Sequence, residues 1–544
     1  MAVSVTLYAQ RVFFVLNRIK NLSVPISFRR LVVLGGAVCG VAVLLLGCKK
    51  VVTHTDEVEV TTWQHPEETR LGHFFTPPEH AEEGESGVYL IPDSRRAFRA
   101  RYSLASEAEK TIDLQYYLWQ EDTTGHLLLY RVLEEADRGV KVRILLDDIY
   151  HTGRDQLYAD VDAHPNVEVR LFNPIANRGI LRNFGFIANT RRYNHRMHNK
   201  IFLIDGAAAI LGGRNIGDEY FAIDPKLNFD DLDALVVGPA AQEAGEAFDL
   251  FWNAEASVPI SNLIKYRPTS DSVSAMRHRL RFELDSVIDD VPYDIPVQAN
   301  KVWEELERVR NAMVWAEAEV IVDVPERYVE KGESKIYEFL AEVHPSVEDE
   351  FYLQSAYLLP EDDTIEAFGE LVDRGVEVSV MTNSLMSNNH LSVHGHYQRS
   401  RSKLVDQGVT LYELRVDGAM MDYYRQRETR LAGSNSGLHT KAFVIDRKIS
   451  VIGSYNMDPR SRVWNSEIAL VVYDPVIGAQ LQAIMAEEML PRNAYRIEKN
   501  GRGKIRWRTE AYGKEVVFTT EPEAPLSKRL MSELISWIPI RGQL

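Results

Sequence analysis

The chain carries one sequence pattern twice, and this duplication constrains its fold more than any other feature. Each copy has a histidine, a lysine two residues later, an aspartate five residues after the lysine and an asparagine 17 residues after the histidine: His198, Lys200, Asp205 and Asn215 in the first copy, and His439, Lys441, Asp446 and Asn456 in the second. One histidine-lysine pair arises by chance in a chain of 544 residues. Two copies with equal internal spacing indicate a duplicated structural unit.

The similarity extends over the residues that precede each motif. Asp137-Arg138-Gly139 is echoed by Asp373-Arg374-Gly375, and apolar runs with strand character lie at matching places in both copies. Each copy is predicted to run strand, helix, strand, helix, strand and then the motif, with the two glycines ending helices. This alternation predicts an α/β fold whose mixed sheets are covered by helices. Two such units related by a pseudo-two-fold axis would bring both motifs to one site.

The alternation of side chains along a strand assigns different places to the motif residues. Residues 196–204 are predicted to form a strand, so His198 and Lys200 point to the same face. Asp205 has the opposite parity and falls where the strand ends. We therefore expect the histidine and lysine to line the site and the aspartate to hold the strand end or the neighbouring backbone. The second copy predicts the same for His439, Lys441 and Asp446.

These residue types fit the cleavage of a phosphodiester. One neutral histidine can attack phosphorus while a second, protonated histidine donates a proton to the leaving oxygen. Histidine suits both tasks because its ordinary pKa is about 6.5. Lys200 and Lys441 supply positive charge, and the amides of Asn215 and Asn456 can donate hydrogen bonds to the phosphate oxygens. The two histidines are equivalent in this pattern, so the nucleophile stays open.

A nucleophilic imidazole also needs an acceptor that holds its second nitrogen. Glu467 lies in a polar-to-apolar run after the second motif, and Asp233 lies in the matching run after the first. Aligning these two predicted strands pairs Asp233 with Glu467. We expect these two carboxylates, and not the motif aspartates, to orient the histidines.

The complete double motif resembles that of the phospholipase D superfamily, over residues 85–500. The longer context, including residues 113–120, 212–220 and 453–461, is similar to bacterial cardiolipin synthases of the C type. The resemblance implies a duplicated α/β/α sandwich with one active site between the units, and catalysis without metal or cofactor. It also implies transfer of a phosphatidyl group from phosphatidylglycerol to a second phospholipid, with phosphatidylethanolamine as one candidate, through a covalent phosphohistidine on His198 and with His439 as the acid.

Two other functions stay open on the same residues. The same site would hydrolyse phospholipids to phosphatidic acid if water were the acceptor. Cleavage of nucleic-acid phosphodiesters is disfavoured, because the net charge of −17 opposes binding to a polyanion. No nucleic-acid partner is therefore expected, and membrane phospholipids are the expected substrates.

The first 48 residues predict attachment to a membrane. An uncharged apolar run at 31–47 follows five basic residues, which places the N-terminus in the cytoplasm and the body in the periplasm of a bacterial cell. Cys48 ends a lipobox-like sequence and is a candidate for lipidation, and an uncleaved membrane helix is the alternative. Cys39 and Cys48 are the two cysteines of the chain, so the body cannot form a disulfide.

The remaining chain divides around the two repeats. We expect a signal or anchor at 1–48, a tether at 49–84, the first unit at 85–260, a helical surface connection at 261–330, the second unit at 331–500 and an extension at 501–544. In that extension, 504–507 and 516–518 are predicted strands. The apolar residues 534–540 are expected to pack onto the body, with insertion into the bilayer interface as the alternative.

Overall fold

The computed structural model describes residues 53–54, 59–151, 153–176, 178, 190–287, 299–328, 332–418, 421–511 and 513–544. The apolar run at 31–47 and Cys48 lie outside these residues. The chain divides into two compact units. The smaller one comprises Met1–Val52 and Ile175–Tyr193 and includes helix α8 (Thr190–Tyr193), and the larger one comprises Thr53–Pro174 and Asn194–Leu544. All features below belong to the larger unit.

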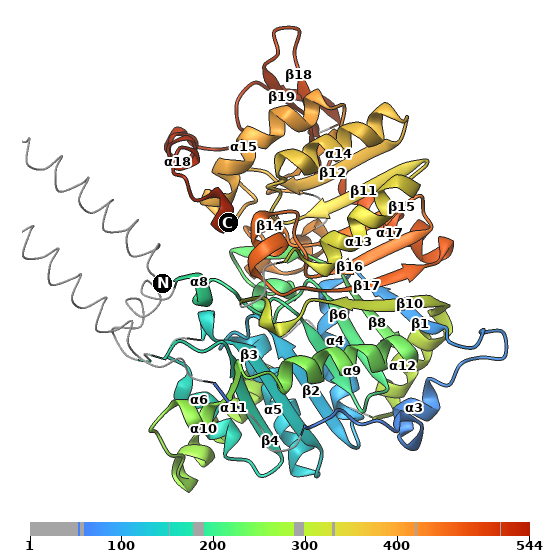
Figure 1. Ribbon diagram of the computed structural model, residues 1–544. Helices are drawn as coiled ribbons and strands as arrows, with labels where there is room; N and C mark the ends of the chain where they lie inside the picture. Colours follow the sequence, from blue (N-terminus) through green and yellow to red (C-terminus); the bar gives the residue numbers. More distant parts are fainter. Residues whose placement is uncertain are drawn as a thin grey trace, which may run out of the picture. The chain divides into compact units, whose positions relative to one another are not determined.

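The first repeat forms a mixed sheet, drawn in blue to green in Figure 1. Along the sheet its strands are ordered β9 (Ser257–Pro259), β4 (Val167–Phe172), β3 (Lys141–Asp147), β2 (Thr111–Tyr116), β5 (Ile201–Ile204), β6 (Ala208–Gly212), β8 (Asp233–Val237) and β1 (Ser86–Ile91). Strands β2, β3 and β4 are parallel, and the other neighbours are antiparallel.

The second repeat forms a sheet of the same order, drawn in yellow to red in Figure 1. Its strands are β17 (Ile468–Tyr473), β16 (Ile449–Gly453), β15 (Lys441–Ile445), β11 (Glu350–Ser355), β12 (Glu377–Asn383), β13 (Thr410–Leu414), β18 (Ala494–Lys499), β19 (Ile505–Ala511) and β20 (Lys514–Phe518). Here β11, β12 and β13 are the parallel strands. The predicted duplicated α/β fold is confirmed.

Helices cover these sheets. The longer ones are α4 (Ser94–Ser106), α5 (Thr123–Asp137), α6 (Asp155–Asp162), α9 (Pro239–Trp252), α13 (Lys335–Val343), α14 (Asp362–Asp373), α15 (Leu391–Asp406) and α17 (Pro475–Glu488), and the short ones are α3 (Arg70–Phe74), α10 (Ile260–Leu263) and α16 (Asp422–Arg427). As predicted, Gly139 and Gly375 follow α5 and α14 with φ of 104° and 91°. No helix in the described part of the chain is long and apolar enough to cross a bilayer.

The two repeats share one apolar core. It contains side chains from β5, β6 and β8 together with side chains from β15, β16 and β17, packed with α9 and α17. Leu211 and Ile452, for example, occupy matching strands and belong to this same core. Burial of this area fixes the two repeats against each other, because separating them would expose it to water.

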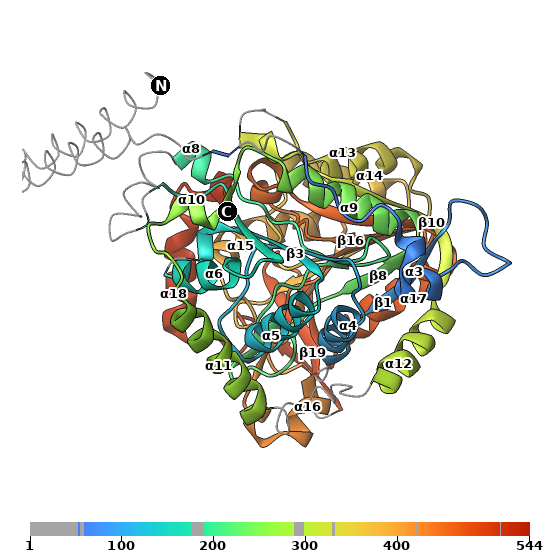
Figure 2. The same ribbon diagram turned by 90° about the horizontal axis from the view of Figure 1, so that it is seen from below.

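The connection between the repeats contains a strand where a surface connection was expected. Helices α11 (Ser270–Val287) and α12 (Ala299–Ala312) are present, and Figure 2 shows α11 beside α5. Strand β10 (Val314–Val322) follows, pairing with β1 through residues 314–316 and with β17 through residues 317–322. The prediction of a helix continuing to residue 317 and of a purely helical connection at 261–330 is wrong. Alternating exposure along β10 keeps it from forming the apolar run expected of a central strand.

The C-terminal extension adds two strands and a helix. The predicted strands at 504–507 and 516–518 are confirmed as β19 and β20, which extend the sheet beyond β18. Residues 526–536 form helix α18 (Leu526–Ser536), which contacts α15. The expected packing of residues 534–540 onto the body is wrong, because Leu534 is 65% exposed and Trp537 is 72% exposed.

Candidate active site

Both motifs lie where the two repeats meet. His198 and Lys200 directly precede β5, and the His198 backbone N–H donates to the carbonyl of Ser466 in the other repeat at 2.8 Å. His439 directly precedes Lys441 and β15, and its N–H donates to the carbonyl of Asp230 at 2.7 Å. Each histidine is therefore fixed by backbone hydrogen bonds from the repeat that does not contain it.

The His198 ring is held by a carboxylate of the second repeat. Its Nδ1 lies 2.7 Å from Oε2 of Glu467, which is fully buried, and 3.1 Å from the carbonyl oxygen of Ser454. The Ser454 hydroxyl and the Asn465 amide also donate to the Glu467 carboxylate. Two acceptors at Nδ1 keep the proton on that nitrogen, which leaves Nε2 to the substrate.

The His439 ring is held in the same way by the first repeat, through a residue that the sequence alignment misplaced. Its Nδ1 lies 2.6 Å from Oδ2 of Asp231, which is buried. The prediction that Asp233 orients this histidine is wrong. The Asp233 carboxylate forms ion pairs with Arg101 at 2.9 Å and Arg214 at 3.2 Å. It braces the turn that leads to Asn215 instead.

The register of the sheets explains the error. Gly212 pairs with Asp233 in the first repeat, and the matching Gly453 pairs with Ala469 in the second. Asp233 therefore corresponds to Ala469, and Asp231 corresponds to Glu467. A shift of two residues leaves the alternation of side chains unchanged, so strand parity cannot distinguish Asp231 from Asp233. The glycines, aligned as partners of the next strand, carry the signal that separates them.

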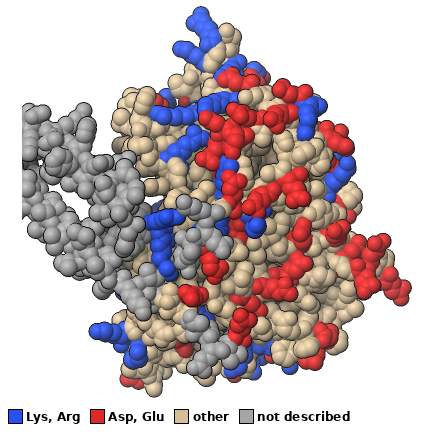
Figure 3. All heavy atoms as spheres, in the orientation of Figure 1, with Lys and Arg blue, Asp and Glu red and all other residues tan. Residues whose placement is uncertain are grey.

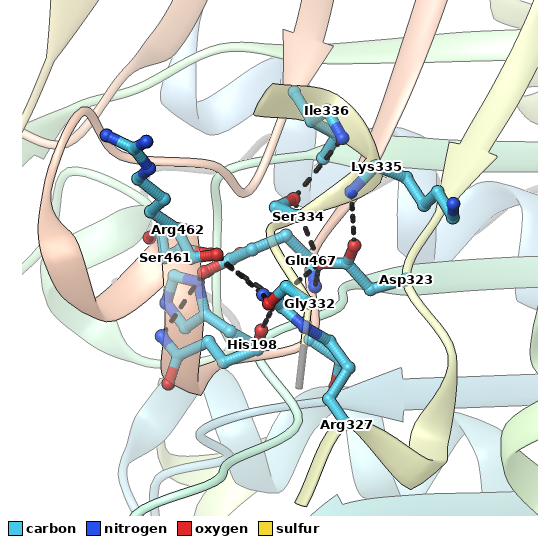
Figure 4. A network of polar contacts seen from close by, with 12 residues as sticks. His198, Asp323, Arg327, Gly332, Ser334, Lys335, Ile336, Ser461, Arg462 and Glu467 are labelled. Carbon is cyan, nitrogen blue, oxygen red and sulfur yellow. Dashed lines mark hydrogen bonds and ion pairs between the residues drawn. The ribbon is translucent and has the colours of Figure 1, made fainter. Parts of the chain in front are cut away.

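A polar network behind Glu467 fixes its backbone, as Figure 4 shows. The Asp323 carboxylate, just after β10, accepts the Glu467 N–H at 2.9 Å and the Lys335 N–H at 2.7 Å. Arg327 pairs with Asp323 at 2.8 Å and donates to the carbonyl of Asn465. The segment that connects the repeats thus holds the strand end that carries Glu467.

The two lysines bring positive charge to both histidines. Lys200 donates to the carbonyl of His198, and Lys441 donates to the carbonyl of His439. Lys200 also contributes to lowering the pKa of His439, and Lys441 to lowering that of His198, so the charges act across the boundary between repeats. Both motifs thus belong to one electrostatic site.

Burial sets the protonation states of the resting site. It lowers the pKa of His198 to about 4 and that of His439 to about 3, although the partner carboxylates act in the opposite direction. Burial also lowers the pKa of Lys441 to about 8. Burial alone would raise the pKa of the Glu467 carboxyl, but His198 and Lys200 together bring it down to about 2. At neutral pH the site therefore contains neutral imidazoles beside ionised carboxylates.

Aromatic rings and the two asparagines complete the surroundings. Tyr117 meets the His198 ring edge-on at 4.9 Å, and Tyr220 meets the His439 ring at 5.1 Å. The Asn215 amide nitrogen donates to the Tyr220 hydroxyl at 3.0 Å, and the Asn456 oxygen accepts from the Tyr357 N–H at 3.4 Å. Tyr220 therefore fixes both the His439 ring and the Asn215 amide.

The motif aspartates lie away from the rings and hold the backbone. The Asp205 carboxylate accepts the N–H groups of Glu109, Lys110 and Thr111 at 2.7–2.9 Å. Asp446 accepts those of residues 348–350 at 2.8–3.0 Å. Both residues have positive φ, 55° and 51°, a conformation that aspartate tolerates better than most side chains. Aspartate thus serves here both as the turn residue and as a hydrogen-bond acceptor.

Comparison with known proteins agrees with this duplicated site. The family model described as cardiolipin synthase, phospholipase D-like domain, matches residues 102–252 and 345–489. The chain belongs to this family. The two matched segments contain the first and the second motif, respectively, and they fall inside the two repeats.

Individual members of this phospholipase D-like family align over most of the chain. Cardiolipin synthase C of Escherichia coli (strain K12) is 33% identical over 477 residues, which cover 85% of this chain and 97% of that protein. An uncharacterized protein of Helicobacter pylori (strain J99 / ATCC 700824) is 30% identical, with 88% and 93% covered. The crystal structure of phosphatidylserine synthase from Haemophilus influenzae Rd KW20 has the same fold, with a TM-score of 0.53 at 13% identity over 84% of this chain and 95% of that one.

Sequence reasoning missed several residues of this phospholipase D-like site. Asp231 was displaced by two residues, and Tyr117, Tyr220, Asp323 and Arg327 went unnoticed. The tyrosines lie within or next to segments that repeat, but a tyrosine near a strand end carries no specific signal. Asp323 and Arg327 act through backbone contacts across the boundary between repeats, which only the folded chain brings together. In the described residues no group of three or more histidine, cysteine or acidic side chains is arranged to hold a metal ion.

Proposed function

We propose that this protein is a phosphatidyltransferase that forms cardiolipin from phosphatidylglycerol and a second phospholipid through a covalent phosphohistidine. One observation carries the proposal: two neutral imidazoles, each held at Nδ1 by a carboxylate of the opposite repeat, share one site with two lysines. Membership of the cardiolipin synthase family and the similarity to cardiolipin synthase C support the choice of lipid.

In the first step, Nε2 of His198 attacks the phosphorus of the donor lipid. A nitrogen–phosphorus bond forms, and the bond from phosphorus to the headgroup oxygen breaks. Protonated His439 gives its proton to that oxygen, and the headgroup leaves as a neutral alcohol. Glu467 stabilises the positive charge that develops on His198, because it accepts the Nδ1 proton.

The resting pKa values require the substrate to charge the acid. His439 is neutral in the free site at neutral pH, since its pKa lies near 3. A bound phosphodiester brings a negative charge next to the ring, which raises the pKa of the imidazole. The same charge favours the ammonium forms of Lys200 and Lys441, which then stabilise the phosphate oxygens with the amides of Asn215 and Asn456.

In the second step, the roles of His439 reverse. It removes the proton from a hydroxyl of the acceptor, whose oxygen attacks phosphorus while the bond to His198 breaks. A glycerol hydroxyl of a second phospholipid as acceptor gives cardiolipin, whereas water gives phosphatidic acid. Hydrolysis is the alternative function, because it uses the same residues and differs only in the acceptor.

The same proposal includes the cellular setting. The apolar run at 31–47 and the lipobox-like Cys48 would attach the chain to the bacterial membrane, with the catalytic body on the periplasmic side. A body anchored to the membrane meets phospholipids at high local concentration. A nuclease function fits this setting poorly, as does the net charge of −17.

The products formed from a labelled donor test the proposal. The full chain, in vesicles, is given phosphatidylglycerol labelled at phosphorus, with and without phosphatidylethanolamine. Labelled cardiolipin is the expected product, and phosphatidic acid as the sole product would exclude the synthase function. After an acid-free quench, His439→Ala given a donor with a nitrophenol leaving group should retain label on the protein, because this leaving group needs no acid. His198→Ala should retain none, and the reverse pattern would assign the nucleophile to His439.

A further inference from the structure

Helix α18 packs onto the unit with its small polar face and directs its large apolar side chains outward. Ser532 and Ser536 are buried against α15, where a Cβ added at Gly395 would lie 2.6 Å from the Ser532 carbonyl oxygen. The opposite face exposes large apolar residues: Leu526, Leu530, Met531, Leu534, Trp537 and Ile538. A surface helix normally buries its apolar stripe. The reversed arrangement indicates an apolar partner outside the protein core.

The exposed residues form one continuous stripe. On a helix of 3.6 residues per turn, Leu526, Leu530, Leu534 and Trp537 fall within an arc of about 80°. Lys528 and Arg529 lie on either side of the face that contains this stripe. Single exposed leucines are ordinary on protein surfaces, but a contiguous stripe of this kind marks an interaction surface.

The charges around α18 are those of a surface that meets anionic lipid. Residues 525–544 contain Lys528, Arg529 and Arg541 but only one acid, Glu533, in a chain whose net charge is −17. Arg399 of α15 lies over the Trp537 ring at 4.7 Å. In Figure 3, acidic side chains spread over the middle and right of the visible face, whereas the corner of α18 at the upper left is tan with blue beside it. Tryptophan, leucine and flanking cations are the composition of helices that lie in a bilayer interface.

The chain after α18 connects this surface to the active site. The N–H of Arg460 donates to the carbonyl of Leu544 at 3.0 Å, and the Trp464 ring N–H donates to that of Gly542 at 2.7 Å. Arg460–Trp464 is the segment that leads from the Asn456 turn to Glu467. It also exposes an apolar side chain of its own, Val463. The stripe on α18 is thus linked through only a few residues to the loop that carries a site carboxylate.

We propose that α18 lays its apolar face into the surface of a phospholipid bilayer that contains anionic lipid. Docked in this way, it presents the active site to substrate that stays in the membrane. The inference deepens the proposed function and rests on it for the identity of the substrate, but the contact with the bilayer can be measured without turnover.

Quenching of Trp537 by lipid tests the contact directly. The full chain is reconstituted in vesicles of phosphatidylglycerol and phosphatidylethanolamine whose acyl chains carry bromine, and in the same vesicles without bromine. The chain has 8 tryptophans, so the emission of Trp537 is taken as the difference between the wild type and Trp537→Phe. Bromine should quench about half or more of that difference. An unquenched difference overturns the proposal, and it does so whether the face is open to water or covered by a second copy of the chain.

Activity on two forms of the same lipid tests the consequence. The double variant Leu534→Ser/Trp537→Ser should transfer about tenfold more slowly on vesicles, because it loses two large apolar side chains from the contact. On short-chain phosphatidylglycerol below its micelle concentration, its rate should stay within about twofold of the wild type. Phe282→Ser on α11 is the matched control, since Phe282 is also exposed and lies outside the stripe. It should leave both rates unchanged.

The outcomes separate this inference from the proposed function. Unchanged vesicle activity of the double variant overturns the docking surface, and so does an equal loss on monomeric lipid, which would show that α18 only supports the fold. A wild type that transfers nothing on either form refutes the proposed function, whereas quenching of Trp537 in the same preparation would still support the docking of α18.

Discussion

Replacing Glu467 with glutamine should separate the carboxylate that orients a histidine from the motif aspartates. The change keeps the shape of the side chain and removes its charge. Nδ1 of His198 lies 2.7 Å from the Glu467 carboxylate, and both groups are buried. A hydrogen bond to a charged partner contributes about 1.5–3 kcal/mol, and the developing imidazolium adds an attraction of about 4 kcal/mol at an effective dielectric constant of 20.

A loss of about 2–4 kcal/mol of transition-state stabilisation corresponds to a decrease in kcat of about 30- to 1000-fold. KM should change little, because neutral His198 contributes equally to the free enzyme and to the substrate complex. The assay is transfer of label from phosphatidylglycerol, with kcat and KM measured separately and corrected for folded protein by circular dichroism. A slower appearance of phosphohistidine in single turnovers would locate the defect in the first step.

Asp446→Asn is the matched control, because it also neutralises one carboxylate. Asp446 accepts three backbone N–H groups and does not contact the histidines. An asparagine oxygen can still accept part of these bonds, so the expected cost is about 1 kcal/mol of stability, with kcat per folded molecule within about threefold. If Asp446→Asn lowered kcat as much as Glu467→Gln at equal folded yield, the assignment of roles would be refuted.

Two further predictions follow from the geometry. Asp231→Asn should lower kcat about as much as Glu467→Gln, whereas Asp233→Asn should lower the free energy of unfolding by about 3–5 kcal/mol, because it leaves Arg101 and Arg214 buried beside a neutral partner; thermal denaturation and kcat per folded molecule check the pair, and the opposite order would contradict the register. Because the pKa of Lys441 is about 8 and its charge is needed on the phosphate, kcat/KM on monomeric lipid should fall as the pH rises through about 8. Lys441→Arg, whose guanidinium stays charged, should lack this decline, and an unchanged alkaline limb would contradict the role of the lysine.

Much of the architecture followed from patterns repeated along the chain. The strand–helix alternation and the two helix-ending glycines predicted the mixed α/β repeats, because these features depend on local periodicity and backbone conformation. Strand β10 was missed because half of its residues face solvent, so its composition does not distinguish it from an exposed helix end. The stripe on α18 was predicted as apolar, but its direction depends on which face Gly395 accommodates.

The sequence by itself determined which chemical groups the site contains, since the spacing of histidine, lysine and asparagine is written twice in the chain. It also indicated one of the two carboxylates. Tertiary structure alone decided that each histidine is paired with the carboxylate of the other repeat, Glu467 for His198 and Asp231 for His439. The physical reason is that a strand's side-chain alternation repeats every two residues and leaves Asp231 and Asp233 equivalent. The register of the folded sheet, fixed by hydrogen bonds and by the shared core, is what distinguishes them.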